Sequence, residues 1–260
     1  MICAGIDAGS RAIKAVLLEY PGMRIVAGGV ADQGVRQDEL VESLYCRLLE
    51  QSGLTAGQIR RRVATGYGRT SIDFADATIT EITCQARGIR RLLPDAKEIV
   101  DIGGQDSKFL RLNPDGGVRD FAANDRCAAG AGRFLEMAAR RLDVSLEEFG
   151  HLASRSTAPA AISSMCAVFA ETEIVGLLAS GADPQDIASG VQRSVAHRVA
   201  SLVRRDSGCP VVFTGGVAMI EGMGKALEEA LGRPVTVAPN PQMTVALGAA
   251  ILACRQAQEE

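Results

Sequence analysis

Two cysteines lie in segments whose composition suits chemistry better than core packing. Cys127 precedes a Gly-Ala-Gly turn in NDRCAAGAGRFLE (124–136), and Cys166 follows two serines in AISSMCAVFAETE (161–173). The turn predicts the start of an amphipathic helix whose apolar face would carry Phe134, Leu135, Met137, Ala138 and Leu142. From the residues alone, Cys127 could be a small core residue, a nucleophile activated by the helix N-terminus, or a thiolate metal ligand.

The cysteine count argues against a disulfide framework. The chain has seven cysteines, an odd number, and no C-x-x-C pair. Five of them lie in or beside apolar patterns, and we expect these in the core: Cys3, Cys46, Cys84, Cys209 and Cys254. Reduced thiols and a metal site assembled in space therefore both stay open.

Two segments repeat one pattern and suit phosphate binding. ICAGIDAGSRAIKAVLL (2–18) and EIVDIGGQDSKFLRL (98–112) each read as a strand, an acid, a glycine turn, a lysine and a second strand. Glycine turns expose backbone N–H groups that can bind phosphate, and Asp7 and Asp101 offer the oxygen ligands that Mg²⁺ prefers. A single Asp-Gly turn could merely close a β-hairpin. The repeat favours the phosphate-binding interpretation and predicts two related lobes.

A third glycine turn follows a late strand in CPVVFTGGVAMIEGMGKALEEAL (209–231). A strand ending in Thr-Gly-Gly before a helix suits a nucleotide base or ribose, although alone it is a weak signal. The chain has no G-x-x-x-x-G-K-[ST] motif. The G-x-G at 130–132 has Leu135 where a dinucleotide fingerprint needs glycine. Neither a P-loop nor a Rossmann site is predicted.

The composition of the chain limits the kinds of partner that it could bind. The chain has 260 residues, 47% hydrophobic content and a formal charge of -3, without a Lys/Arg-rich run. We therefore expect no nucleic-acid and no membrane partner. No apolar run approaches the roughly 20 residues that span a bilayer, and Met1 leads directly into a strand pattern. We expect a cytoplasmic protein.

The order of the three turns resembles the two-lobed α/β ATPase fold of actin, sugar kinases and heat-shock chaperones. More specifically, the chain is similar to the ATP-dependent activator (component A) of 2-hydroxyacyl-CoA dehydratases, in the wider family of benzoyl-CoA reductase ATPase subunits. The stretches that carry this resemblance are GIDAGSRAIK, ATGYGRT, DIGGQDSKFL, NDRCAAGAGRFLE, AISSMCAVFAETE, VFTGGVA and ALGAAILA.

The resemblance implies two lobes and a nucleotide site. Lobe I would cover 1–95, with a C-terminal helix 244–260 packed back on it, and lobe II would cover 96–243. Asp7 and Asp101 would hold Mg²⁺. ATP or ADP would contact Gly9, Ser10, Arg11, Lys14, Gly103, Gly104, Gly215, Gly216 and Gln242. Asp101 and Gln105 would be catalytic, Gln105 by orienting water, although Gln105 also fits a plain polar turn. Arg11 departs from the family, where Thr is common.

The resemblance also implies that Cys127 and Cys166 ligate a [4Fe-4S] cluster. Two cysteines per chain require two chains for four ligands, so the cluster would bridge a homodimer. The implied function is ATP-driven transfer of an electron from ferredoxin or flavodoxin to a 2-hydroxyacyl-CoA dehydratase partner. Alternative acceptors are a double-cubane cluster protein and benzoyl-CoA reductase. Alternatives of another class are a small-molecule kinase and a chaperone- or actin-like module on the same fold.

Overall fold

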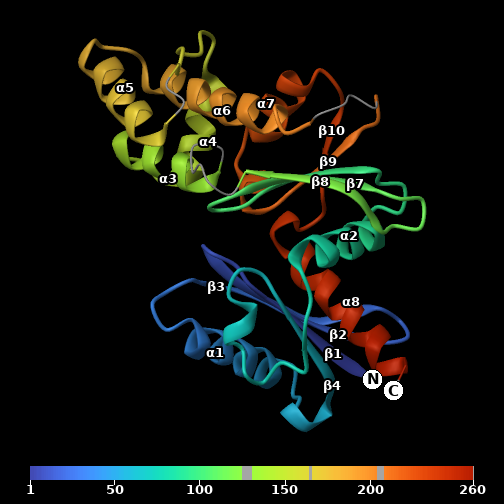
Figure 1. The fold of residues 1–260 in the computed structure, drawn as a ribbon. Helices are drawn as coiled ribbons and strands as arrows, with labels where there is room; N and C mark the ends of the chain where they lie inside the picture. Colours follow the sequence, from blue (N-terminus) through green and yellow to red (C-terminus); the bar gives the residue numbers. More distant parts are fainter. Residues whose placement is uncertain (125–130, 164–165, 204–207, 260) are drawn as a thin grey trace. The chain divides into compact units, whose positions relative to one another are not determined.

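The structure is a computed structural model that describes residues 1–124, 131–163, 166–203 and 208–259. The chain divides into two compact units (Figure 1). Unit 1 comprises Met1–Asp95, Leu112–Val118 and Met243–Glu260, and unit 2 comprises Ala96–Arg111 and Arg119–Gln242. Each unit has its own sheet and its own buried core.

Unit 1 contains a five-stranded sheet built from β1 (Ile2–Ala8), β2 (Ala12–Glu19), β3 (Arg24–Asp32), β4 (Ile59–Thr65) and β5 (Ala77–Thr78). The strand order is β3-β2-β1-β4-β5. β1 and β2 form an antiparallel hairpin that β3 extends, whereas β4 pairs in parallel with β1 and β5 with β4. The first predicted hairpin is therefore present at the centre of the sheet.

Helices cover both faces of this sheet: α1 (Gln37–Gln51), α2 (Glu81–Leu92) and α8 (Thr244–Glu259), with 3-10 turns η1 (Ala56–Gln58) and η2 (Arg69–Ser71). Successive side chains on a strand point to opposite faces, so Ile6 packs with α1 and Cys3 with α8. At Gly5 the backbone of α8 comes so close that a Cβ would lie 2.2 Å from the Ala246 carbonyl oxygen. The C-terminal helix thus packs on the strand that starts the chain.

Unit 2 repeats the strand order with β6 (Glu98–Ile102), β7 (Ser107–Leu112), β8 (Val118–Asn124), β9 (Val211–Thr214) and β10 (Val235–Val237). The order β8-β7-β6-β9-β10 matches that of unit 1 strand for strand. β6 and β7 are the antiparallel hairpin, and β9 pairs in parallel with β6. The internal repeat seen in the sequence is thus a duplication of the whole sheet.

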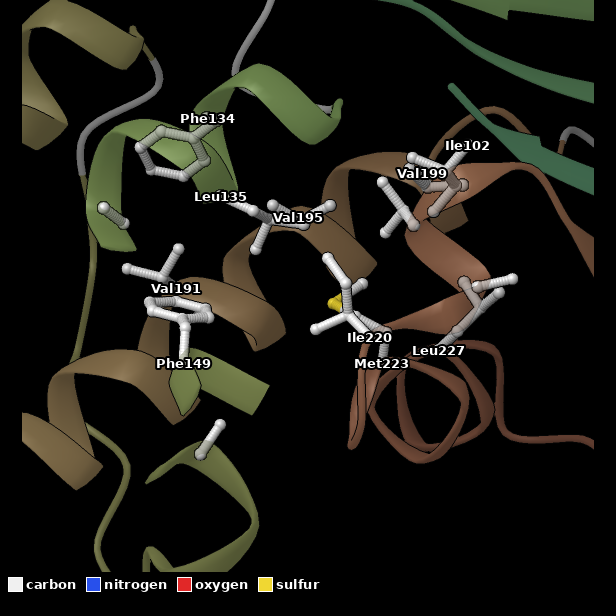
Figure 2. Packing of buried hydrophobic residues seen from close by; sticks show 14 of the residues in the cluster. Ile102, Phe134, Leu135, Phe149, Val191, Val195, Val199, Ile220, Met223 and Leu227 are labelled. Carbon is white, nitrogen blue, oxygen red and sulfur yellow. The ribbon is translucent and has the colours of Figure 1, made fainter. Parts of the chain in front are cut away.

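The helices of unit 2 are α3 (Gly132–Arg141), α4 (Leu146–Arg155), α5 (Ala167–Ala179), α6 (Pro184–Ala200) and α7 (Met223–Leu231), with η4 (Gly216–Met219) and η5 (Pro241–Met243). Figure 2 shows their packing, in which Leu135 of α3 lies beside Val195 of α6 and Phe149 of α4 beside Val191 of α6. The expected apolar face of α3 is confirmed, because Phe134, Leu135 and Ala138 are buried. Among the described residues, no helix is long and apolar enough to cross a bilayer.

The expectation of a core position was wrong for Cys46. It is exposed on α1, whose buried face is made instead by Val41, Leu44, Tyr45, Leu48 and Leu49. Helical periodicity puts Cys46 beside this face and not within it. Cys209 is half-buried, and Cys3, Cys84 and Cys254 are buried as expected.

Candidate functional site: two glycine hairpins and a cysteine helix

The acid of the first hairpin is paired with the lysine across the strands. Asp7 lies opposite Lys14 in the β1–β2 register, and the Lys14 Nζ lies 2.7 Å from Asp7 Oδ2. Both side chains are largely buried, and Lys14 Nζ also donates to the Ala12 carbonyl at 3.2 Å. The structure therefore joins two residues that the sequence placed in separate roles, one on metal and one on phosphate.

The carbonyl groups of the first turn are held by segments from elsewhere in unit 1. Gln33 Nε2 donates to the Gly9 carbonyl at 2.9 Å, and the Gly68 amide donates to the Ala8 carbonyl at 3.0 Å. The bulky cation of the turn lies along β3, because Arg11 Nη1 contacts Asp32 Oδ1 at 2.9 Å. The hydrogen bonds to the Ala8 and Gly9 carbonyl oxygens thus hold in place the turn that contains Ser10.

The second hairpin has the same register and a different ion pair. Lys108 lies opposite Asp101, as Lys14 lies opposite Asp7, but its ammonium contacts the carboxylate of Asp106. Asp106 has no acidic counterpart in the first turn. Gln105 is exposed beside it, while Gly103 and Gly104 are partly covered. An exposed amide can face water or a ligand, so the position of Gln105 is compatible with its expected role.

The carbonyl groups of the second turn are held by helix α3. The Gly132 amide donates to the Gly103 carbonyl at 2.9 Å, and the Arg133 amide donates to the Gly104 carbonyl at 2.8 Å. These are N–H groups of the first helical turn, which have no partner inside the helix. The start of α3 thus binds directly to the predicted phosphate turn.

A Thr-Gly pair lies beside the acid in each unit. Thr65 aligns with Asp7 between β4 and β1, and Thr214 aligns with Asp101 between β9 and β6. The next residues, Gly66 and Gly215, have φ of 89° and 90°. A Cβ on either glycine would lie 2.4 Å from Oδ1 of the neighbouring aspartate. Only glycine fits this close approach, so both acids sit under a Thr-Gly turn.

The Thr-Gly-Gly turn of unit 2 contacts the segment that contains Gln242. The Pro241 carbonyl accepts hydrogen bonds from Thr214 Oγ1 at 2.7 Å and from the Gly215 amide at 3.0 Å. Gln242 Nε2 lies 4.0 Å from the position that a Cβ on Gly216 would occupy. The structure therefore brings together Gly215, Gly216 and Gln242, three of the five residues of unit 2 expected to contact the nucleotide.

Of the two cysteines singled out, Cys127 lies outside the described residues. Cys166 is exposed and is the residue directly before α5. Two other thiols are unsuited to ligation, since burial raises the pKa of Cys84 to about 12. A hydrogen bond with Cys3, followed by burial, raises the pKa of Cys254. Cys166 is exposed directly before a helix, so its sulfur is accessible to an iron–sulfur group.

Within the described ranges, no group of three or more His, Cys, Asp and Glu side chains is close enough to hold a metal ion. The carboxylates of Asp7 and Asp101 each lie beside a Thr-Gly turn. They fit a cation that is bound mainly by phosphate oxygens and water, as Mg²⁺ commonly is.

Sequence reasoning missed three features of this site. Lys108 was not singled out, although it follows Asp101 at the same spacing as Lys14 follows Asp7. Thr65-Gly66 was not paired with Thr214-Gly215, although both follow apolar strands. These two could have been found by aligning the halves of the chain. The bond from Gln33 to the first turn has no such signal.

Comparison with known proteins identifies close relatives. Residues 4–253 match the profile described as the BadF/BadG/BcrA/BcrD ATPase family. The chain is 46% identical over its whole length to the activator of lactoyl-CoA dehydratase from Anaerotignum propionicum, all of which is covered. It is 40% identical to the (R)-2-hydroxyglutaryl-CoA dehydratase activating ATPase of Acidaminococcus fermentans, with 97% of each chain covered.

Solved structures agree on the fold. The activator of 2-hydroxyisocaproyl-CoA dehydratase from Clostridium difficile, solved with bound ADPNP, superposes with a TM-score of 0.93 at 39% identity, covering 100% of this chain and 96% of that one. A hexokinase of the ROK type from Thermus thermophilus has a TM-score of 0.56 at 17% identity, with both chains fully covered. The predicted α/β fold shared with sugar kinases is confirmed.

Proposed function

The chain belongs to the BadF/BadG/BcrA/BcrD ATPase family, and on this basis we propose that it is an ATPase coupled to electron transfer. As a homodimer, it carries single electrons from a ferredoxin or flavodoxin to a 2-hydroxyacyl-CoA dehydratase. Several relatives at 40% identity or more are named as activators of such dehydratases, which supports this choice of partner.

The observation that carries the proposal is the joint between the second turn and α3. The amides of Gly132 and Arg133 hold the carbonyls of Gly103 and Gly104, and α3 starts five residues after Cys127. A change in the turn on nucleotide binding or hydrolysis would therefore move the helix that follows this cysteine. An ATPase that only stored a metal group would not need this connection.

The two hairpins would share the work on the nucleotide. The amides of Gly9, Ser10, Gly103 and Gly104 would bind phosphate, as glycine turns do elsewhere. Gly215, Gly216 and Gln242 would contact the base or ribose. Asp7 and Asp101 would hold Mg²⁺ directly or through water, with Lys14 beside the phosphates and Arg11 at the edge of the turn. Gln105 would orient the attacking water.

Cys127 and Cys166 of two chains would hold one [4Fe-4S] cluster as thiolates. When bound, such a cluster supplies reversible one-electron storage at low potential. The exposed thiol of Cys166 supports a site shared with another molecule, because a ligand meant for a site within one chain would be enclosed by it. The free amides at the start of α5 would stabilise negative charge on this sulfur.

The face of α5 beyond Cys166 supports a homodimer. Val168 and Phe169 are 68% and 69% exposed, and Val175 is 46% exposed. Of the helix only Ala170 and Ile174 are buried in unit 2. An exposed apolar helix of this kind marks an interface, and a two-fold axis beside it would bring two copies of Cys166 together.

Iron content after anaerobic purification tests the proposal. The wild-type protein should be a brown dimer with four iron and four sulfide per two chains. Cys127→Ser and Cys166→Ser each remove two of four ligands, so both should lose most of the iron, while Cys46→Ser, at an exposed thiol on α1, should keep it. Iron retained in both variants, or four iron per monomer, would contradict the shared site.

A further inference from the structure

A solvent-open pocket of about 290 Å³ lies on unit 2, between α6 and the segment 159–163. Every residue that lines it belongs to unit 2. The segment leads toward Cys166, which follows Ser163 by three residues. The pocket is separate from both glycine hairpins, and no role considered so far uses it.

The wall of this pocket is anchored at both of its ends. On one side, the Ala160 amide donates to the Asp186 carbonyl at 2.9 Å, and Ser156 Oγ donates to Asp186 Oδ1 at 2.7 Å. On the other, the Ser163 amide and Oγ donate to Glu173 Oε1 of α5 at 3.0 and 2.8 Å. These bonds preform the pocket within unit 2.

The wall approaches α6 because Gly190 has no side chain. A Cβ at this position would lie 2.1 Å from the Ala160 carbonyl oxygen. The pocket opens directly beyond this contact, along the C-terminal half of α6. Backbone packing at Gly190 therefore fixes the inner end of the pocket.

The polar lining of the pocket comes from Ser163 of the wall and from three hydrogen-bond donors of α6. Arg193, Ser194 and His197 lie within about one helical turn of one another, and Pro159 and Ile162 supply apolar surface. Among the residues that the structure describes, no Asp or Glu lines the pocket. An arginine fork with a hydroxyl and an imidazole beside it suits a planar anion, for which carboxylate is the common protein example.

Glu229 and Glu173 lie near the pocket but do not cancel the positive charge of its lining. Arg193 Nη2 lies 4.0 Å from Glu229 Oε2, and both side chains are about half exposed. Such a pair is weak, so a second carboxylate can compete for the guanidinium. Glu173 is bound to Ser163. The net character of the pocket is cationic.

We propose that this pocket binds a carboxylate side chain of the protein that delivers the electron. The inference rests on the proposed function. Weak electron-transfer complexes bury little surface and are steered by opposite charges, which a single cationic pocket with an apolar wall can supply. The wall of the pocket leads toward Cys166, so a donor docked here would lie near the thiolate proposed to hold the cluster.

Stopped-flow reduction with photoreduced ferredoxin as the probe tests this docking site. Arg193→Glu should lower the second-order rate constant at low salt by about tenfold or more and weaken its salt dependence. His197→Glu should act in the same direction. Reduction by dithionite and ATP turnover should stay within about twofold of the wild type, because neither uses the pocket.

Arg24→Glu is the matched control. It makes the same charge change at a 67% exposed arginine of unit 1, where Arg24 pairs with Glu19. If Arg193→Glu slows reduction by ferredoxin no more than Arg24→Glu does, the docking site is wrong. If inorganic phosphate binds in an Arg193-dependent way while ferredoxin reduces both proteins equally, the occupant is a small anion and the choice of a protein is wrong.

Calorimetric titration with oxidised ferredoxin separates this inference from the proposed function, because binding does not require iron in the chain. Arg193→Glu should raise Kd about tenfold. Weakened binding to an iron-free protein would support the pocket although electron transfer had failed. Absence of ferredoxin binding to the wild-type protein would overturn the pocket whatever its iron content.

Discussion

In the first hairpin Lys14 lies opposite Asp7 and contacts its carboxylate. In the second hairpin Lys108 lies opposite Asp101 and contacts Asp106. The strand registers are the same, but the turns differ, because the first turn has Ala12 where the second has Asp106. The duplicated scaffold thus carries an additional acid that contacts the lysine in only one of its copies.

The two turns also differ in which groups donate hydrogen bonds to their backbone carbonyls. Gln33 and the Gly68 amide hold the first turn, and both belong to unit 1. The second turn is held by the amides of Gly132 and Arg133 at the start of α3. The comparison indicates a division of labour. On the proposed function, the first hairpin would serve as a fixed support for the nucleotide, and the second would connect the nucleotide to the helix that follows Cys127.

Replacement of Asp101 should have the largest effect on turnover. Asp101→Ala removes the carboxylate assigned to the metal in the second hairpin, and we expect kcat for ATP to fall by about 10²-fold or more. Mg²⁺-dependent phosphate release measures it. Asp120→Ala, at an exposed acid of β8, is the control and should be near wild type. Unchanged turnover and Mg²⁺ dependence in Asp101→Ala would place the metal elsewhere.

Replacement of Asp7 should chiefly reduce stability. Asp7→Ala leaves the largely buried Lys14 ammonium without its carboxylate, and breaking a buried pair in this way costs about 3–5 kcal/mol. Urea unfolding measures the loss in free energy of unfolding. Adding Lys14→Met should recover a large part of it, because the uncompensated charge is then removed. A stability unchanged by Asp7→Ala would show that the pair does not hold the first hairpin.

The α3 joint should control the response to nucleotide. In the wild type, an iron chelator should strip iron severalfold faster with Mg-ATP than with Mg-ADP. In Gly132→Ala, the new Cβ would lie 3.1 Å from the Gly103 carbonyl oxygen and 3.2 Å from Val217 Cγ2, so the joint must shift. The ratio of the two rates should then approach one.

Gly57→Ala controls for the substitution itself, since a Cβ there meets nothing within 4 Å. Binding of both nucleotides must be confirmed in each variant. If Gly132→Ala binds both nucleotides and keeps the wild-type ratio of chelation rates, the inferred connection between the second turn and the cysteines is wrong.

The smallest effect is expected at the first turn. Gln33→Ala removes one hydrogen bond to the Gly9 carbonyl, worth about 1 kcal/mol, so KM for ATP should rise by up to about fivefold with kcat nearly unchanged. Gln37 Nε2 reaches the Ala8 carbonyl only at 3.5 Å, and Gln37→Ala should change KM less. A fall in kcat for Gln33→Ala would mean that the first hairpin takes part in the chemical step.

Local patterns sufficed to predict much of the fold. Both hairpins, the strand before Thr214 and the buried face of α3 follow from apolar runs, glycine turns and helical periodicity, which act within a few residues. The predicted core position of Cys46 was wrong because apolar neighbours in the sequence do not show which side of a helix a residue faces. The roles of the named site residues stay predictions, and Cys127 awaits the iron assay.

Two copies of strand, acid, glycine turn and lysine can be read in the residue order, so the duplication of the scaffold follows from the sequence. What each copy contacts follows from the packing of the folded chain. Lys108 contacts Asp106 of its own turn, and Gln33 and Gly132 reach the two turns from distant parts of their units. Such contacts depend on how strands and helices pack in three dimensions. A pattern of neighbours along the chain carries no record of that packing.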